Sequence, residues 1–156
     1  MRFLRFSSVF FVLALIMPAC DPGRVLDQNI AVSEQGWDKN EKATFEVYIG
    51  DTLATYRFFV NLRNTVDYRY SNFYLFLNTR FPNGNITRDT IECMLADPAG
   101  AWLGRGNGQI RENQILLNPS LKFPLKGTYH FEVEQAMRDD VLKGITDIGI
   151  RIQKEN

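Results

Sequence analysis

The feature of this sequence that most constrains its fold is a repeated alternation of apolar and polar residues along short runs. Apolar side chains occupy every second position at Phe45, Val47 and Ile49. In an extended chain this period of two places the apolar side chains of a run on one face. Seven such runs follow one another along the chain: 42–49, 55–63, 73–79, 87–95, 108–117, 127–135 and 147–153.

The segments between these runs carry residues that form turns, such as Asn83-Gly84 and Asp97-Pro98. Short strands separated by turns at regular spacing are typical of two packed antiparallel sheets. The sequence therefore predicts an all-β fold, with a single β-sandwich domain over residues 37–156.

One short helix is expected as an interruption at residues 135–142. Met137 and Val141 are four residues apart, which matches the helical period, and Gly144 follows as a stop. The neighbouring acids Asp139 and Asp140 are interpreted as the solvated face of this helix.

The N-terminal segment is typical of an export signal. Arg2 and Arg5 precede an uncharged run over residues 6–17. That length matches the apolar region of a signal peptide and is shorter than the ~20 residues that a membrane-spanning helix needs. Residues 1–19 are therefore predicted to be a signal peptide.

The quartet Met17-Pro18-Ala19-Cys20 resembles a bacterial lipobox, in which Cys20 becomes the lipidated first residue of the mature protein. Pro18 is unusual at its position. The alternative is ordinary cleavage after Ala19, which would leave Cys20 as a free and reactive thiol in an oxidising compartment. We expect Cys20 to be the lipid anchor and residues 20–36 to be a lipidated cysteine followed by a flexible tether.

The cysteines and the charge balance limit which kinds of fold stabilisation and which kinds of partner the mature chain can have. Cys93 is the only cysteine besides Cys20, so no intramolecular disulfide is expected in the mature chain. Cys93 alternates with Ile91 and Leu95 and is predicted to be a small buried hydrophobe. Loss of residues 1–19 leaves 16 basic against 18 acidic residues and a formal net charge of −2, which argues against a nucleic-acid partner.

Two of the predicted strands, 55–63 and 73–79, are apolar on both faces. One explanation is that a loop or the 135–142 helix covers the second face, because monomers seldom expose large apolar patches. The other is a surface that binds a partner protein, since Tyr, Phe and Arg are enriched at interfaces. The candidate partner-binding residues are Arg57, Phe59, Tyr68, Tyr70, Tyr74 and Phe76.

Residues suited to catalysis or metal binding are few. His130 is the only histidine, so a site with several histidine ligands cannot form. The glycine-rich stretch 104–108 lacks the Lys-Ser/Thr pair and the helix of a phosphate loop. We expect no catalytic residues, no metal and no cofactor.

Two segments resemble the Asp-Thr-apolar acceptor pattern for O-glycans in some bacterial periplasmic proteins. They are Asp51-Thr52-Leu53 and Asp89-Thr90-Ile91. Thr52 is the better candidate because it falls in a predicted turn, whereas Thr90 falls within a strand. Chance is the alternative explanation of both matches.

Four longer segments, taken in order, resemble one known protein family. In order they are DYRYSNFYLFL (67–77), DTIECMLADPAGAWLGRGNGQIREN (89–113), GTYHFEVEQAMR (127–138) and GITDIGIRI (144–152). Behind a lipobox, this order resembles the gliding-motility lipoprotein family GldH of Bacteroidota. The resemblance implies a cell-envelope lipoprotein of the gliding machinery, a system linked to type IX secretion, with no enzymatic activity attributed to the family.

The expected function is that of a non-enzymatic structural or assembly lipoprotein, held at the membrane by lipid and partnered by other envelope proteins. The alternative is a carbohydrate-binding β-sandwich lipoprotein, because exposed aromatic rings also stack on sugars. Asp-Pro-Gly-Arg after Cys20 lacks the acidic run associated with surface export in this phylum. This favours a periplasm-facing location.

Overall fold

The computed structural model describes residues 23–155, and all regular structure in this range is β-strand. The strands are β1 (Arg24–Ala31), β2 (Trp37–Asp38), β3 (Ala43–Ile49), β4 (Tyr56–Thr65), β5 (Asn72–Arg80), β6 (Ile86–Met94), β7 (Ile110–Leu121), β8 (Gly127–Gln135), β9 (Val141–Leu142) and β10 (Ile145–Lys154).

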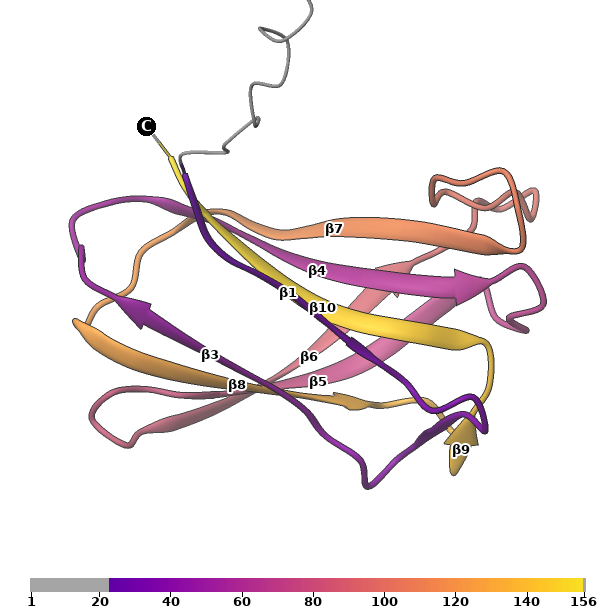
Figure 1. The fold of residues 1–156 in the computed structure, drawn as a ribbon, viewed down its shortest axis with the longest axis horizontal. Coiled ribbons are helices and arrows are strands. Elements are labelled where there is room, and N and C mark those ends of the chain that lie inside the picture. The colour runs from indigo at the N-terminus through magenta and orange to yellow at the C-terminus, as the bar shows by residue number, and fades with distance from the viewer. Residues whose placement is uncertain (1–22, 156) are drawn as a thin grey trace, which may run out of the picture.

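Two four-stranded antiparallel sheets face each other (Figure 1). The first has the strand order β1-β10-β4-β7 and the second the order β3-β8-β5-β6, while β2 and β9 form a small additional pair. The predicted β-sandwich is confirmed, and each of the seven alternating runs coincides with a strand: β3, β4, β5, β6, β7, β8 and β10.

The core lies between the inner faces of the two sheets. Phe58 of β4 meets Phe131 of β8 with ring centroids 5.3 Å apart in an edge-to-face arrangement. At one end of the core Trp37 stacks on Phe73 and donates its indole N–H to the carbonyl oxygen of Glu41 at 3.0 Å. Cys93 is fully buried in this core, as its alternation with Ile91 and Leu95 predicts.

The flexible tether predicted over residues 20–36 is wrong for residues 24–31. Residues 24–31 form β1, which pairs with β10 along the edge of the first sheet. Leu26 and Ile30 are partly buried and pack against the core. The segment looks like a tether in sequence because only these two inner positions are strongly apolar, and an edge strand can be polar elsewhere. Cys20 lies outside the described residues.

The helix predicted over residues 135–142 is also wrong. Gln135 ends β8, and residues 141–142 form β9. The side-chain amide of Gln135 accepts a hydrogen bond from the backbone N–H of Met137 at 2.8 Å and donates one to the carbonyl oxygen of Asp139 at 2.7 Å. Because a helix this short is marginal on its own, these contacts and the burial of Leu142 decide the local structure.

No helix in residues 23–155 is long and apolar enough to cross a bilayer.

Candidate functional site

The predicted partner-binding residues do not lie on one surface. Alternation along β4 places Arg57 and Phe59 on the outer face of the first sheet, because Phe58 and Val60 point into the core. The same argument places Tyr74 and Phe76 of β5 on the outer face of the second sheet. The two pairs therefore lie on opposite sides of the sandwich, and the prediction of a single aromatic docking surface is wrong.

Two of the six candidates are buried and cannot bind a partner directly. Phe59 is 6% exposed, and the guanidinium of Arg57 lies 5.0 Å from its ring centroid. Tyr68 is 4% exposed and donates its hydroxyl to the carbonyl oxygen of Asn72 at 3.0 Å. The alternative explanation, that the second apolar face is covered, holds for Phe59, although no helix covers it.

The other aromatic candidates are partly exposed and already have intramolecular contacts. Tyr70 donates its hydroxyl to the carboxylate of Asp139 at 2.9 Å. Tyr74 is 36% exposed. The guanidinium carbon of Arg88 lies 4.0 Å from the ring centroid of Phe76, so that one face of this ring is occupied.

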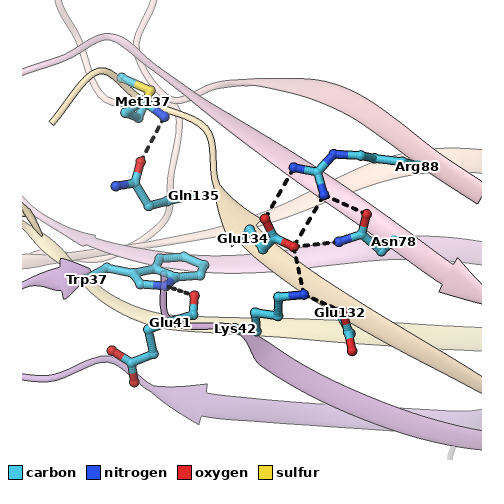
Figure 2. A network of polar contacts seen from close by, with 9 residues as sticks. All are labelled: Trp37, Glu41, Lys42, Asn78, Arg88, Glu132, Glu134, Gln135 and Met137. Atoms are coloured by element: carbon cyan, nitrogen blue, oxygen red, sulfur yellow. Dashed lines mark hydrogen bonds and ion pairs between the residues drawn. The ribbon is translucent and has the colours of Figure 1, made fainter. Parts of the chain in front are cut away.

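Arg88 belongs to a polar network on the outer face of the second sheet (Figure 2). It donates to both carboxylate oxygens of Glu134, at 3.3 and 3.2 Å, and to the side-chain oxygen of Asn78 at 2.8 Å. Lys42 pairs with Glu132 at 3.0 Å and with Glu134 at 3.3 Å. The network joins β8, β5 and β6, and Lys42 extends it to the residue before β3.

Glu134 is the centre of this network. Burial of its carboxyl raises its pKa, but the hydrogen bonds from Arg88, Lys42 and Asn78 outweigh burial, and the net pKa lies below the usual value of 4.5. Glu134 is therefore ionised at neutral pH. The arrangement is typical of a stabilising contact, since every partner of this carboxylate is a side chain of the same sheet.

A groove of about 500 Å³ lies over the first sheet and the free edge of β7. We call it the polar groove. Its lining comes from β1, β4 and β7, from the end of β6 and from the connector that follows: Asp27, Asn29, Asn61, Leu62, Arg63, Met94, Leu103, Gly104, Arg105, Glu112, Asn113, Gln114 and Ile115.

The floor of the polar groove is a row of polar side chains across three strands. Asn61 donates its amide to Asp27 at 3.2 Å and accepts a hydrogen bond from Gln114 at 3.3 Å. Between these strands, Gly149 of β10 has no side chain, and a Cβ there would collide with the side chain of Asn29. The side chain of Asn29 therefore lies over Gly149, and the floor is lined with amide and carboxylate groups.

The rim of the groove comes from the connector between β6 and β7. Arg105 and Glu112 exchange both backbone hydrogen bonds at 2.8 Å, which holds the connector along the free edge of β7. Met94 and Leu103 are 52% and 58% exposed at this rim. Met94 at this rim and Arg63 and Arg105 in the lining are of residue types that are enriched at protein interfaces.

Sequence reasoning missed this groove. Asn29, Asn61 and Gln114 are far apart in the chain, and each is an ordinary polar residue of an alternating strand. They meet because the register pairs Asn29 with Gly149, Gly149 with Asn61, and Asn61 with Gln114. Pairing register is not readable from a single strand, so no sequence signal pointed to this site.

The side chains most suited to catalysis are engaged in surface contacts. His130 lies on the outer face of β8, 3.4 Å from the carboxylate of Glu46. Asp140 pairs with Lys39 at 2.5 Å, whereas Asp139 accepts the hydroxyl of Tyr70. Within residues 23–155 there is no group of three or more His, Cys, Asp and Glu side chains placed to hold a metal ion.

The candidate acceptors of O-glycans differ in accessibility. Thr52 is partly buried in the turn after β3, where Asp51 accepts hydrogen bonds from the backbone N–H groups of Leu53 and Ala54. Thr90 is exposed on the outer face of the edge strand β6. On exposure alone, the structure favours Thr90 over Thr52.

Comparison with known proteins decides the family. The family model described as GldH lipoprotein matches residues 24–152, which run from the first residue of β1 nearly to the end of β10. The chain belongs to the GldH lipoprotein family. This family assignment agrees with the resemblance carried by the segments 67–77, 89–113, 127–138 and 144–152.

Two curated relatives match nearly the whole length of the chain. It is 38% identical to a protein named gliding motility lipoprotein GldH homolog from Christiangramia forsetii, over 97% of each chain. It is 32% identical to the gliding motility lipoprotein GldH of Flavobacterium johnsoniae, over 96% of this chain and 97% of the relative. Membership of a lipoprotein family supports the membrane anchorage predicted from Cys20.

Proposed function

We propose that this protein is a membrane-anchored structural or assembly component of the gliding-motility machinery, without enzymatic activity and linked to type IX secretion. The observation that carries the proposal is the similarity to two gliding motility lipoproteins over nearly the whole chain. Cys20 supplies the anchor, and the domain faces the periplasm.

The polar groove is the surface through which this component binds another envelope protein. Exposed Leu103 and Met94 at its rim offer apolar contact area, and Arg63 and Arg105 in its lining offer charged hydrogen-bond donors. The non-enzymatic role is supported by the way polar groups are used on both sheets. The carboxylates of Asp27 and Glu134 are bonded to Arg151 and Arg88 and serve as cross-strand ties.

A crosslinked pull-down of the lipidated protein from its native envelope tests this proposal. The wild-type protein should capture a defined envelope protein, and Leu103→Asp should lose it, because the change places a charge at the apolar rim. His130→Ala, on the outer face of the opposite sheet, is the matched control and should keep the partner. Capture that is the same for all three proteins would reject the groove as the binding surface.

Carbohydrate binding is the second candidate, and the lining of the polar groove is the observation that favours it. Asn29, Asn61 and Gln114 present amides of the kind that bind sugar hydroxyls. Stacking of sugars on aromatic rings is less well supported, since Phe59 is buried and Arg88 occupies a face of Phe76. Saturable binding to an envelope polysaccharide on a glycan array, lost in Gln114→Ala, would establish this alternative.

Hydrolytic activity is the test of the non-enzymatic role. The purified protein should show none against envelope glycans and peptides. Activity that a single Asp or Glu substitution abolishes would overturn the proposal.

A further inference from the structure

We propose that one end of the sandwich rests directly on the lipid bilayer, with Leu53 entering the headgroup region and Arg24, Lys122 and Lys126 contacting anionic headgroups. We call it the anchor end. It comprises residues 23–24, the turn 50–55, the turn 81–85, the connector 122–126 and residues 154–155. The inference rests on the lipid anchor at Cys20 and goes beyond it, because an anchor alone leaves the orientation of the domain open.

The length of chain between the lipid and the sandwich is the first argument. The carbonyl oxygen of Gly23 accepts a hydrogen bond from the backbone N–H of Lys154 at 2.7 Å, and Arg24 is paired with Gln153. Cys20 precedes Gly23 by three residues in the sequence. Three residues span at most about 11 Å, which is close to the ~5–8 Å thickness of one headgroup layer. Gly23 is therefore held near the membrane surface.

The strand register shows which other segments share this end (Figure 1). Lys154 pairs with Tyr56, and Tyr56 with Leu121, which brings the turn 50–55 and the connector 122–126 beside the chain start. Gly127 pairs with Ile49, and a Cβ at Gly127 would touch Pro82, so the turn 81–85 also lies here. Because these segments lie at the same end as Gly23, they contact the bilayer when Gly23 is held at the membrane surface.

Leu53 is the most exposed large hydrophobic residue among those described, at 90%. It lies on a turn that is held in place by contacts of Asp51. Asp51 accepts the backbone N–H groups of Leu53 and Ala54 at 3.0 and 3.1 Å, and its carboxylate pairs with Lys154 at 2.9 Å. Because the turn is tied to β10 in this way, the leucine cannot fold back onto the domain. A fixed, protruding leucine close to a lipid anchor suits insertion between headgroups.

The charges of the anchor end also suit contact with anionic lipid headgroups. Its loops and chain ends contain four basic residues and two acidic ones, Asp51 and Glu155, although the mature chain is acidic overall. Lys154 neutralises Asp51. Arg24, Lys122 and Lys126 are exposed and form no ion pair with another described residue. Such residues at a membrane surface are attracted to anionic lipid.

A fluorescent label on Leu53 tests the proposal in the full-length lipidated protein reconstituted into vesicles. Leu53→Cys is labelled with a thiol-reactive NBD probe, which reports on water at its position. Cys93 does not compete for the probe, because it is fully buried. In vesicles that contain phosphatidylglycerol, the label should shift its emission to the blue and be quenched by lipids spin-labelled near the headgroup.

Leu103→Cys is the matched control, since this exposed leucine lies on the connector beyond β6, at the opposite end of the sandwich. Its label should keep the emission seen in water and escape quenching. Lys122→Glu combined with Lys126→Glu should reduce the quenching at position 53. Emission typical of water at position 53, or equal quenching at both positions, would overturn the proposal.

Flotation of the same vesicles separates this proposal from the lipid anchor on which it rests. Protein that floats with the vesicles while position 53 remains in water would reject the contact of the anchor end and leave the anchor intact. Protein that does not float would reject both.

Discussion

At the scale of single residues, burial separates side chains that support the fold from those that reach the surface. Phe59 and Tyr74 both lie on outer faces of the sandwich, yet the first is 6% exposed and the second 36%. Phe59→Ala should lower the free energy of unfolding by about 3 kcal/mol, because it leaves a cavity beneath Arg57. Tyr74→Ala should cost about 0.5 kcal/mol. Urea denaturation measures both, and equal losses would contradict the assignment.

The thiol of Cys93 should be inert in the folded protein. It is fully buried, and burial raises its pKa to about 12. The reactive thiolate is therefore scarce at neutral pH as well as inaccessible. Ellman's reagent should leave Cys93 unmodified in the native state and react with it in denaturant. Rapid reaction of the folded protein would mean that this part of the core opens.

The two candidate O-glycan acceptors, Thr52 and Thr90, differ in how accessible they are to a glycosylating enzyme. A glycan on Thr52 would separate Leu53 from the bilayer, whereas Thr90 is exposed on β6. If the protein is O-glycosylated, peptides of the native protein should carry the glycan on Thr90 and leave Thr52 unmodified. Mass spectrometry of the two peptides measures this, and a glycan on Thr52 would contradict the contact proposed for the anchor end.

The ionised form of Glu134 should stabilise the second sheet. Its pKa in the folded protein is below the usual value of 4.5. The stabilisation is therefore present above pH 4.5 and is lost as the pH falls through the lower pKa of the folded state. Wild type should exceed Glu134→Gln in melting temperature at pH 7, and the difference should shrink at pH 3. A difference independent of pH would show that the charge contributes nothing.

At the scale of elements, the alternation of apolar residues is sufficient to locate the long strands. β3 and β8 follow the pattern set by Phe45, Val47, Phe131 and Val133, and each lies where the sequence predicts. β1 was missed because Leu26 and Ile30 alone mark its inner face. The 135–142 helix does not form, because the period between Met137 and Val141 is only a local signal. Gln135 pairs instead with Leu75 of β5, and Leu142 pairs with Trp37 of β2, both outside the segment.

The attachment of β1 can be tested in the intact chain with glycine substitutions. Gly149→Ala should destabilise the fold by about 1–3 kcal/mol, because the added methyl collides with the backbone of Gln28 and the side chain of Asn29 in β1. Gly108→Ala is the control, since no atom lies within 4 Å of its Cβ position. Thermal melting compares the two, and equal melting temperatures would mean that β1 is not closely packed on β10.

At the scale of the whole molecule, the proposed anchor is close to the fold along the chain. β1 begins four residues after Cys20, so that lipid on Cys20, as proposed, would hold the sandwich by one end, with the rim at Leu103 at the other. The sequence alone suggested the lipid, the sandwich and the family. It could not supply the polar groove or the anchor end, because both depend on which residues the strand register brings together.

Measuring the lipidation of Cys20 tests most directly the central claim that the protein is a lipoprotein anchored at this residue. Wild type and Cys20→Ala are labelled in the native host with a fatty-acid analogue and partitioned between detergent and water. We predict that wild type carries the label and enters the detergent phase, while Cys20→Ala carries none. Wild-type protein that takes up no lipid and partitions wholly into water would contradict a lipoprotein anchored at Cys20.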